Sequence, residues 1–374
     1  MLLCLVALLA CSSKPQEVEP TPLQRFERQL DVKLVWRRYS GHGSGDMPLR
    51  LTPAITEQAL YVADSRGKVR AIRRDNRRTI WHRRTGLRIA SAVAAGYGVV
   101  LFGTRDGEAL ALSSEDGSLR WQVALSSEVL ARPATDGERA IFQTQDGRVV
   151  ALSIDDGRLL WSYEEVEPIL SLRGTAAPQI VAGQVYAGFA NGRVVALDLA
   201  SGTPLWERRV AEPGGRSELE RLVDIDGNLI IEGGGVFAAA FQGRAVVIDQ
   251  QNGQIYWDYE SSTAVPTASL SGKLIIAGQD GVVVALDQRS GTELWRQPQL
   301  AERGLTGVAV QQGYAVVGDA QGYLHWLDPA SGDIVARRFH NRGGFSAALQ
   351  VRDDILYVVS RDGEVGAYRI KARQ

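Results

Sequence analysis

Short apolar runs and tight polar turns alternate along most of this chain, and one version of that pattern returns eight times. Each copy starts with a glycine, has apolar residues two and five positions later, and usually has alanine four positions after the glycine. A spacing of about 40 residues is the period of β-propeller blades, so the pattern predicts eight blades. The eight glycines are Gly67, Gly107, Gly147, Gly192, Gly243, Gly281, Gly322 and Gly363.

The third copy shows what one repeat predicts. Residues 140–144, 149–153 and 159–163 are apolar and β-prone, and a further short run covers 131–135. Asp-Gly pairs, such as Asp146–Gly147, separate these runs and are typical of hairpin turns. Four antiparallel strands per repeat are the unit of a propeller blade.

In six copies a tryptophan lies fourteen residues after the first glycine. In six copies a second glycine lies ten residues after the first glycine. Such a repeated tryptophan is expected to pack between neighbouring blades, with its N–H group bonded to a partner. The tryptophans are Trp81, Trp121, Trp161, Trp206, Trp257 and Trp295.

The two ends of the chain complement each other. The seventh copy has Ala336 in place of tryptophan, and the eighth ends before its outer strand. Residues 32–36 supply a β-prone run at the other end of the chain, and it includes Trp36. The sequence therefore predicts an all-β, eight-bladed β-propeller over residues 31–370, with four antiparallel strands per blade and a ring closed by the N-terminal strand.

The start of the chain is a different kind of segment. Residues 1–10 are apolar and predict a signal peptide, followed by Cys11 in the sequence Leu-Leu-Ala-Cys. That ending resembles a bacterial lipobox, which implies cleavage before Cys11 and lipid attachment to it, and the non-acidic Ser12 implies outer-membrane sorting. Residues 11–30 then form a polar, proline-containing tether. A chance cysteine in an uncleaved apolar start is the alternative.

Two copies carry a longer phrase in its clearest form, Asn191–Trp206 and Asp280–Trp295. This phrase resembles the pyrroloquinoline-quinone-type propeller repeat. Quinoprotein dehydrogenases share this repeat with the BamB family, which are lipoproteins of the outer-membrane β-barrel assembly machinery. With its lipobox, short tether and eight blades, the chain resembles the second family. The resemblance implies a non-enzymatic scaffold without cofactor, lipid-anchored at the periplasmic face of the outer membrane. Its implied partner is the periplasmic part of the barrel-forming subunit, and blade edges are a further expected contact for nascent outer-membrane proteins.

The same resemblance implies where docking occurs. Leu170, Leu172 and Arg173 stand just before the fourth blade, and Asp224 and Asp226 stand before the fifth. Both segments connect an outer strand to the next inner strand, so they are expected side by side on one face, with apolar and arginine anchors typical of an interface. The alternatives are buried leucines, a solvated arginine and a simple Asx turn.

Composition narrows the remaining functions. The formal net charge of -1 gives no general attraction to nucleic acid or to a membrane, and both cysteines lie in the first eleven residues. A quinone-dependent dehydrogenase and an adaptor of another envelope complex remain the alternatives. One region is locally basic. It predicts a patch that meets anionic headgroups or an acidic partner, and the alternative is a solvated rim of blade 1. Its basic residues are Arg66, Lys68, Arg70, Arg73, Arg74, Arg77, Arg78, Arg83, Arg84 and Arg88.

Overall fold

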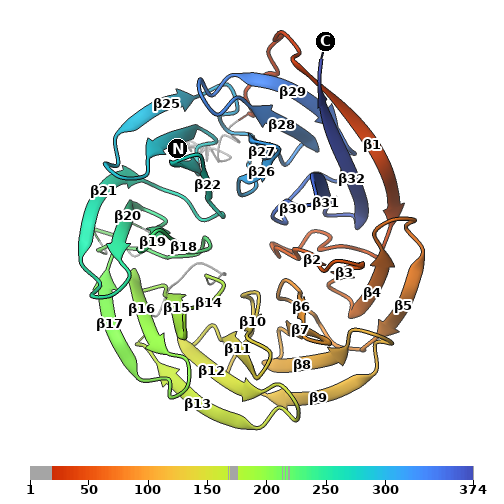
Figure 1. Cartoon of the computed structure of the whole chain (residues 1–374), viewed down its shortest axis with the longest axis vertical. Helices are drawn as coiled ribbons and strands as arrows, with labels where there is room; N and C mark the ends of the chain where they lie inside the picture. Colours follow the sequence, from red (N-terminus) through yellow and green to blue (C-terminus); the bar gives the residue numbers. More distant parts are fainter. Residues whose placement is uncertain are drawn as a thin grey trace, which may run out of the picture.

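Eight four-stranded antiparallel sheets surround a central axis and confirm the predicted eight-bladed propeller (Figure 1). The computed structural model describes residues 19–166, 168, 176–212, 214, 216–217 and 220–373. Within this part of the chain, no helix is long and apolar enough to span a membrane.

The strands of each blade follow one another from the axis to the rim. Blade 1 contains β2 (Ala54–Ile55), β3 (Ala59–Ala63), β4 (Lys68–Arg73) and β5 (Thr79–Arg84), and blade 2 contains β6 (Ala94–Gly96), β7 (Val99–Gly103), β8 (Glu108–Ser113) and β9 (Leu119–Ala124). Blade 3 contains β10 (Ala134–Thr135), β11 (Arg139–Gln143), β12 (Arg148–Ser153) and β13 (Leu159–Glu164), and blade 4 contains β14 (Gln179–Val181), β15 (Gln184–Gly188), β16 (Arg193–Asp198) and β17 (Pro204–Arg209).

The second half of the ring repeats this order. Blade 5 contains β18 (Ile230–Glu232), β19 (Gly235–Ala239), β20 (Gly243–Asp249) and β21 (Ile255–Ser261), and blade 6 contains β22 (Ala268–Leu270), β23 (Lys273–Ala277), β24 (Val283–Asp287) and β25 (Glu293–Gln297). Blade 7 contains β26 (Ala309–Gln311), β27 (Tyr314–Gly318), β28 (Tyr323–Leu327) and β29 (Ile334–Phe339), and blade 8 contains β30 (Gln350–Arg352), β31 (Ile355–Val359), β32 (Glu364–Ala372) and β1 (Leu30–Tyr39).

The N-terminal strand closes the ring as the sequence predicts. Strand β1 pairs antiparallel with β32, from Leu30 opposite Ala372 to Tyr39 opposite Glu364. Leu30 and Trp36 on β1 are buried, so the closing strand also contributes to the core. Pairing with β1 covers the edge of β32, which would otherwise be open to association, and β1 becomes the outer strand of blade 8, the place that β5 has in blade 1.

The repeated tryptophans join neighbouring blades by one recurring hydrogen bond. Each indole N–H donates to a backbone carbonyl oxygen in the turn before the outer strand of the next blade, and Trp36 takes part as the predicted substitute in blade 8. The bonds are Trp36 to Arg74 at 3.2 Å, Trp81 to Ser114 at 2.9 Å, Trp121 to Ile154 at 2.8 Å, Trp161 to Leu199 at 2.9 Å, Trp206 to Gln250 at 2.9 Å, Trp257 to Gln288 at 3.1 Å and Trp295 to Pro329 at 3.0 Å.

The second glycine of the repeat packs on the tryptophan of the preceding blade. At Gly202, for example, φ is +72°, and an added β-carbon would lie 2.5 Å from the Trp161 ring. The same close approach occurs between Gly291 and Trp257 and between Gly332 and Trp295. The two sequence signals of the repeat are therefore the two sides of one interface between blades.

The junction from blade 7 to blade 8 uses a different side chain. Ala336 replaces the tryptophan, and the Gln311 amide donates to the carbonyl oxygens of Asp354 at 2.9 Å and Tyr368 at 3.0 Å. Trp326 in turn donates to Gln311 Oε1 at 2.9 Å. A buried glutamine thus replaces the missing indole contact.

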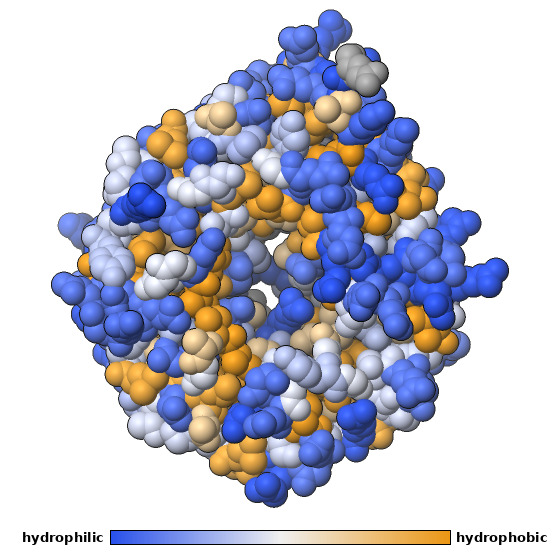
Figure 2. Space-filling model, in the orientation of Figure 1, coloured by the Kyte–Doolittle hydropathy of each residue, from blue (hydrophilic) through white to orange (hydrophobic). Residues whose placement is uncertain are grey.

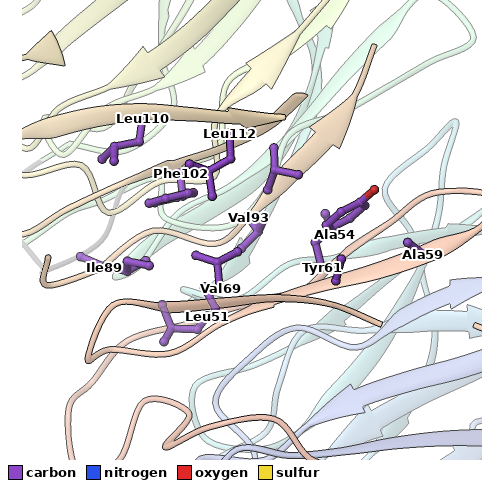
Figure 3. Packing of buried hydrophobic residues seen from close by; sticks show 14 of the residues in the cluster. Leu51, Ala54, Ala59, Tyr61, Val69, Ile89, Val93, Phe102, Leu110 and Leu112 are labelled. Carbon is purple, nitrogen blue, oxygen red and sulfur yellow. The ribbon is translucent and has the colours of Figure 1, made fainter. Parts of the chain in front are cut away.

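Apolar side chains of adjacent blades form continuous clusters between the sheets. In Figure 3, Tyr61 and Val69 of blade 1 lie in one cluster with Phe102, Leu110 and Leu112 of blade 2. Val69, Phe102 and Leu112 are fully buried. The core is therefore a ring of inter-blade layers.

Residues 19–29 lie against the ring before β1 begins. The Thr21 N–H donates to the Ala301 carbonyl oxygen at 3.1 Å, and the Gln29 N–H donates to the Val335 carbonyl oxygen at 2.9 Å. Arg303 and Arg337 donate to the carbonyl oxygens of Thr21 and Gln24 at 2.9 and 3.0 Å. This end of the predicted tether is held by hydrogen bonds to blades 6 and 7.

The alternating strand directions place the loops at defined ends of the ring. Because each blade has four antiparallel strands, every connector from an outer strand to the next inner strand leaves at the same end. We call it the connector end. The turns that carry the first glycine of each repeat also lie there, and the turns that carry the second glycine lie at the opposite end.

Candidate docking site at the connector end

The first segment predicted to dock runs from β13 to β14. It begins at Glu165, whose N–H donates to the Gly147 carbonyl oxygen at 2.9 Å. The Asn191 side-chain amide donates to Glu165 Oε1 at 2.8 Å and to the Val166 carbonyl oxygen at 3.0 Å. Val166 is 83% exposed, the highest value among the large apolar residues that the structure describes. Leu170, Leu172 and Arg173 lie outside the described residues, as does Cys11.

The second segment leads from β17 to β18, and both of its predicted site residues are buried. Asp224 is fully buried, and its carbonyl oxygen accepts the Phe241 N–H at 2.7 Å. The Ile225 N–H donates to the Phe189 carbonyl oxygen at 3.3 Å. The aspartates thus belong to a segment that is fixed to blades 4 and 5.

The two segments come together at Gly188, the last residue of β15. A β-carbon on Gly188 would lie 2.5 Å from Ile225 Cγ2 and 3.1 Å from Ala176 Cβ. Ala176 stands three residues after Arg173, and Ile225 stands between the two aspartates. A residue without a side chain therefore lets both connectors pack against the same part of blade 4.

Asp226 forms an ion pair across the axis of the ring. Its Oδ2 atom lies 3.0 Å from Arg50 Nη1, which also donates to the Ala264 carbonyl oxygen at 2.5 Å. The Asp226 side chain is 4% exposed and that of Arg50 is 38% exposed. Burial raises the pKa of Asp226, and the charge and hydrogen bond of Arg50 oppose that rise. The pair connects the connector of blade 5 to blades 1 and 6.

A cavity of about 340 Å³ lies at this end of the central channel. All eight blades contribute to its wall, which includes Leu49, Leu130, Pro266 and Val308. Figure 2 shows the opening at the centre of the ring, with hydrophobic residues along part of its rim. The charged residues of the wall are Arg50, Arg132 and Asp226.

The sequence pointed to Asp226 but not to its partner. Arg50 lies far from Asp226 in the chain and in no recognisable motif, so only the closed ring brings the two together. Gly188 was also missed, because it lies outside the repeated glycine positions. Among the residues that the structure describes, no group of three or more His, Cys, Asp or Glu side chains is placed to hold a metal ion.

The fold and its repeats define the class: an eight-bladed propeller built from quinoprotein-type repeats, with two connectors packed together on one end. A family model described as "Outer membrane protein assembly factor BamB" matches residues 65–280 and 279–373. The chain belongs to this family, which confirms the resemblance seen in the repeats.

Individual relatives extend over nearly the whole chain. The BamB proteins of Pseudomonas aeruginosa and Xanthomonas campestris are 37% and 35% identical to it; the matches cover 98% and 96% of this chain and 97% and 91% of the relatives. The crystal structure of BamB from Moraxella catarrhalis has a TM-score of 0.84 at 30% identity, covering 91% of this chain and 100% of that one. A quinohemoprotein alcohol dehydrogenase from Comamonas testosteroni has a TM-score of 0.73 at 15% identity, covering 92% of this chain and 77% of that one, and shares the fold alone.

Proposed function

We propose that the chain is a non-enzymatic scaffold of outer-membrane β-barrel assembly that docks through the connector end of blades 4 and 5. Its partner is the periplasmic part of the barrel-forming subunit, and the scaffold assists the folding and insertion of outer-membrane proteins by that subunit. The observation that carries the proposal is the packing of two connectors on one residue, Gly188, in a chain whose relatives are named as outer membrane protein assembly factors. Val166, exposed beside the first connector, supports an apolar contact there.

The predicted site residues divide into two roles. Leu170, Leu172 and Arg173 are proposed to touch the partner, as apolar and arginine anchors do in protein interfaces. Asp224 and Asp226 are buried, so they are proposed to hold the second connector in shape.

The remaining parts of the chain position this site. Residues 1–10 are proposed to be removed as a signal peptide, and Cys11 to carry the lipid that anchors the chain at the periplasmic face of the outer membrane. Residues 11–30 connect that anchor to the propeller at 31–370. Edge addition of nascent strands to the blades is a second proposed contact.

The test is recovery of the barrel-forming subunit from solubilised envelopes. Wild type is expected to recover it, and Arg173→Glu to lose it through reversal of an interface charge. Asp224→Ala/Asp226→Ala is expected to lose it through displacement of the connector. Arg289→Glu is the matched control, since Arg289 is exposed in a turn at the opposite end of blade 6. Circular dichroism confirms that each variant is folded.

The outcomes distinguish a failure of the proposed scaffold function from a failure of the proposed docking site. If wild type never recovers the subunit, an adaptor of another envelope complex replaces the assembly scaffold. Recovery that is equal for all the variants would leave the scaffold role and move the interface elsewhere on the ring.

A further inference from the structure

The basic region of the sequence forms a concave surface where blade 1 meets blade 8. A cleft of about 570 Å³ is lined there by Ser40, Arg66, Lys68, Arg70 and Arg84, together with Tyr39, Gly41, His42 and Asp64. We call it the blade 1 cleft. It lies at the connector end, across the ring from blades 4 and 5 (Figure 1), so an inference about it does not rest on the proposed docking site.

The cations of the cleft face one another. Lys68 on β4 stands directly opposite Arg84 on β5, an arrangement that destabilises a sheet when both residues carry the same charge. Burial lowers the pKa of Lys68, and the charge of Arg70 lowers it further; the charge of Asp64 opposes this, and those of Arg84 and Arg38 add to it. Among the described residues, no ion pair is formed by the four cationic side chains that line the cleft, Arg66, Lys68, Arg70 and Arg84.

One carboxylate, that of Asp64, lines the cleft, and backbone N–H groups already donate hydrogen bonds to both of its oxygens. Asp64 Oδ1 accepts the N–H groups of Arg66 and Lys68, both at 3.0 Å, and Oδ2 accepts the N–H of His42 at 3.1 Å. Asp64 therefore shapes the turn that presents the cations. It does not form a salt bridge with them.

Other blades show the counter-charge that blade 1 lacks. In blades 3, 4 and 5 the residue after the first glycine is an arginine, and each one pairs with a carboxylate on the outer strand. These pairs are Arg148–Glu164 at 3.0 Å, Arg193–Glu207 at 2.7 Å and Arg244–Asp258 at 3.4 Å. In blade 1 the matching positions on the outer strand are His82 and Arg84, so the cations have no partner within the sheet.

Two polar groups of the cleft have no hydrogen-bond partner in the described part of the chain. They are Ser40 Oγ, in a residue that is 5% exposed, and Arg70 Nε. A hydroxyl, a guanidinium and further cations around one hollow are donors suited to the oxygens of a tetrahedral anion. We infer that the blade 1 cleft binds a phosphate group, carried either by free phosphate or by an anionic phospholipid.

The first test measures the melting temperature Tm of the full chain with Cys11→Ser, so that no lipid anchor contributes. Potassium phosphate at about 10 mM is compared with potassium chloride at the same ionic strength. Phosphate is expected to raise Tm by about 1–2 °C more than chloride does, because it binds the folded state alone.

Arg84→Glu makes the test specific, because it supplies the carboxylate that blade 3 has at this position. It is expected to raise Tm in chloride, by forming a pair with Lys68, and to abolish the response to phosphate. Arg209→Glu is the matched control: Arg209 occupies the same repeat position opposite Arg193 in blade 4, and this variant should respond to phosphate as wild type does. No extra response in wild type, or an undiminished response in Arg84→Glu, would overturn the inference.

Co-sedimentation with vesicles identifies the carrier of the phosphate. Binding to phosphatidylglycerol-containing vesicles but not to pure phosphatidylcholine vesicles, with loss in Arg84→Glu, assigns the cleft to anionic phospholipid. A response to phosphate without sedimentation assigns it to free phosphate.

Discussion

Asp226 and Arg50 show how a single contact can hold a connector in place. Replacing Arg50 by alanine leaves a nearly buried carboxylate without its cation, and hydrogen bonds to charged groups contribute about 1.5–3 kcal/mol. We expect Arg50→Ala to lower the free energy of unfolding by about 2 kcal/mol in urea titrations. The same change in an Asp226→Asn background should cost much less, and an equal cost in both backgrounds would contradict a specific pair.

His325 predicts a dependence of stability on pH. It is fully buried, and its Nε2 atom lies 2.9 Å from Asp319 Oδ2, while Arg337 Nε donates to its Nδ1 atom at 3.3 Å. Burial lowers the pKa of His325 below 6.5; Asp319 opposes this, and the charges of Arg337 and Arg303 add to it. The unfolded chain therefore takes up a proton at higher pH than the folded chain does.

The expected result is a loss of stability on acidification. The free energy of unfolding should fall as the pH drops below about 6.5 towards the lower pKa of the folded state. Denaturant titrations between pH 7.5 and pH 5 measure it (roughly the range in which histidine titrates). His325→Gln keeps a donor for Asp319 and should show a weaker pH dependence; an unchanged dependence would assign the effect to other groups, such as His340.

At the scale of the elements, the glycine–tryptophan contact between blades can be separated from backbone strain. Gly202 and Gly183 both have positive φ, +72° and +76°, but only Gly202 would place a β-carbon against a ring. Gly183→Ala is expected to cost about 1 kcal/mol from backbone conformation alone. Gly202→Ala should cost clearly more, because Trp161 must move. Equal losses in thermal unfolding would mean that the ring contact adds nothing.

The strands themselves were largely predictable, because alternation and tight turns are local signals. In blade 3 the predicted runs 140–144, 149–153 and 159–163 became β11 to β13 with ends shifted by one residue or less. The innermost run, 131–135, is shorter in the structure, where β10 is only Ala134–Thr135. Pro133 precedes β10 and has no N–H group for a ladder, and Arg132 lines the central cavity.

At the scale of the whole molecule, the ring depends on strand β1. Deleting residues 1–39 would expose the edge of β32 and remove Leu30 and Trp36 from buried positions. We expect this variant to aggregate or to lose its cooperative unfolding transition, as measured by size-exclusion chromatography and circular dichroism. Deleting residues 1–28 removes the contacts of Thr21 and Gln24 with blades 6 and 7 but keeps Gln29 and β1, and should leave a folded monomer. The same behaviour in both variants would show that closure does not depend on β1.

The sequence alone determined the number of blades, their strand order and the closure of the ring. These features depend on glycine turns, on the alternation of apolar and polar residues and on a tryptophan at a constant offset. All three signals concern residues within one repeat or in adjacent repeats, so they can be recognised from spacing along the chain. The resemblance to the family followed from the repeated phrase together with the lipobox and the short tether.

Only the tertiary structure decided which side chains share a site. It paired Asp226 with Arg50 across the axis, buried Asp224 and Asp226, and placed Ala176 and Ile225 against Gly188. It also gathered Arg66, Lys68, Arg70 and Arg84 around one cleft with Ser40. The physical reason is that closing a ring brings together residues from distant repeats, and whether a charge is paired depends on that meeting rather than on its neighbours in the chain.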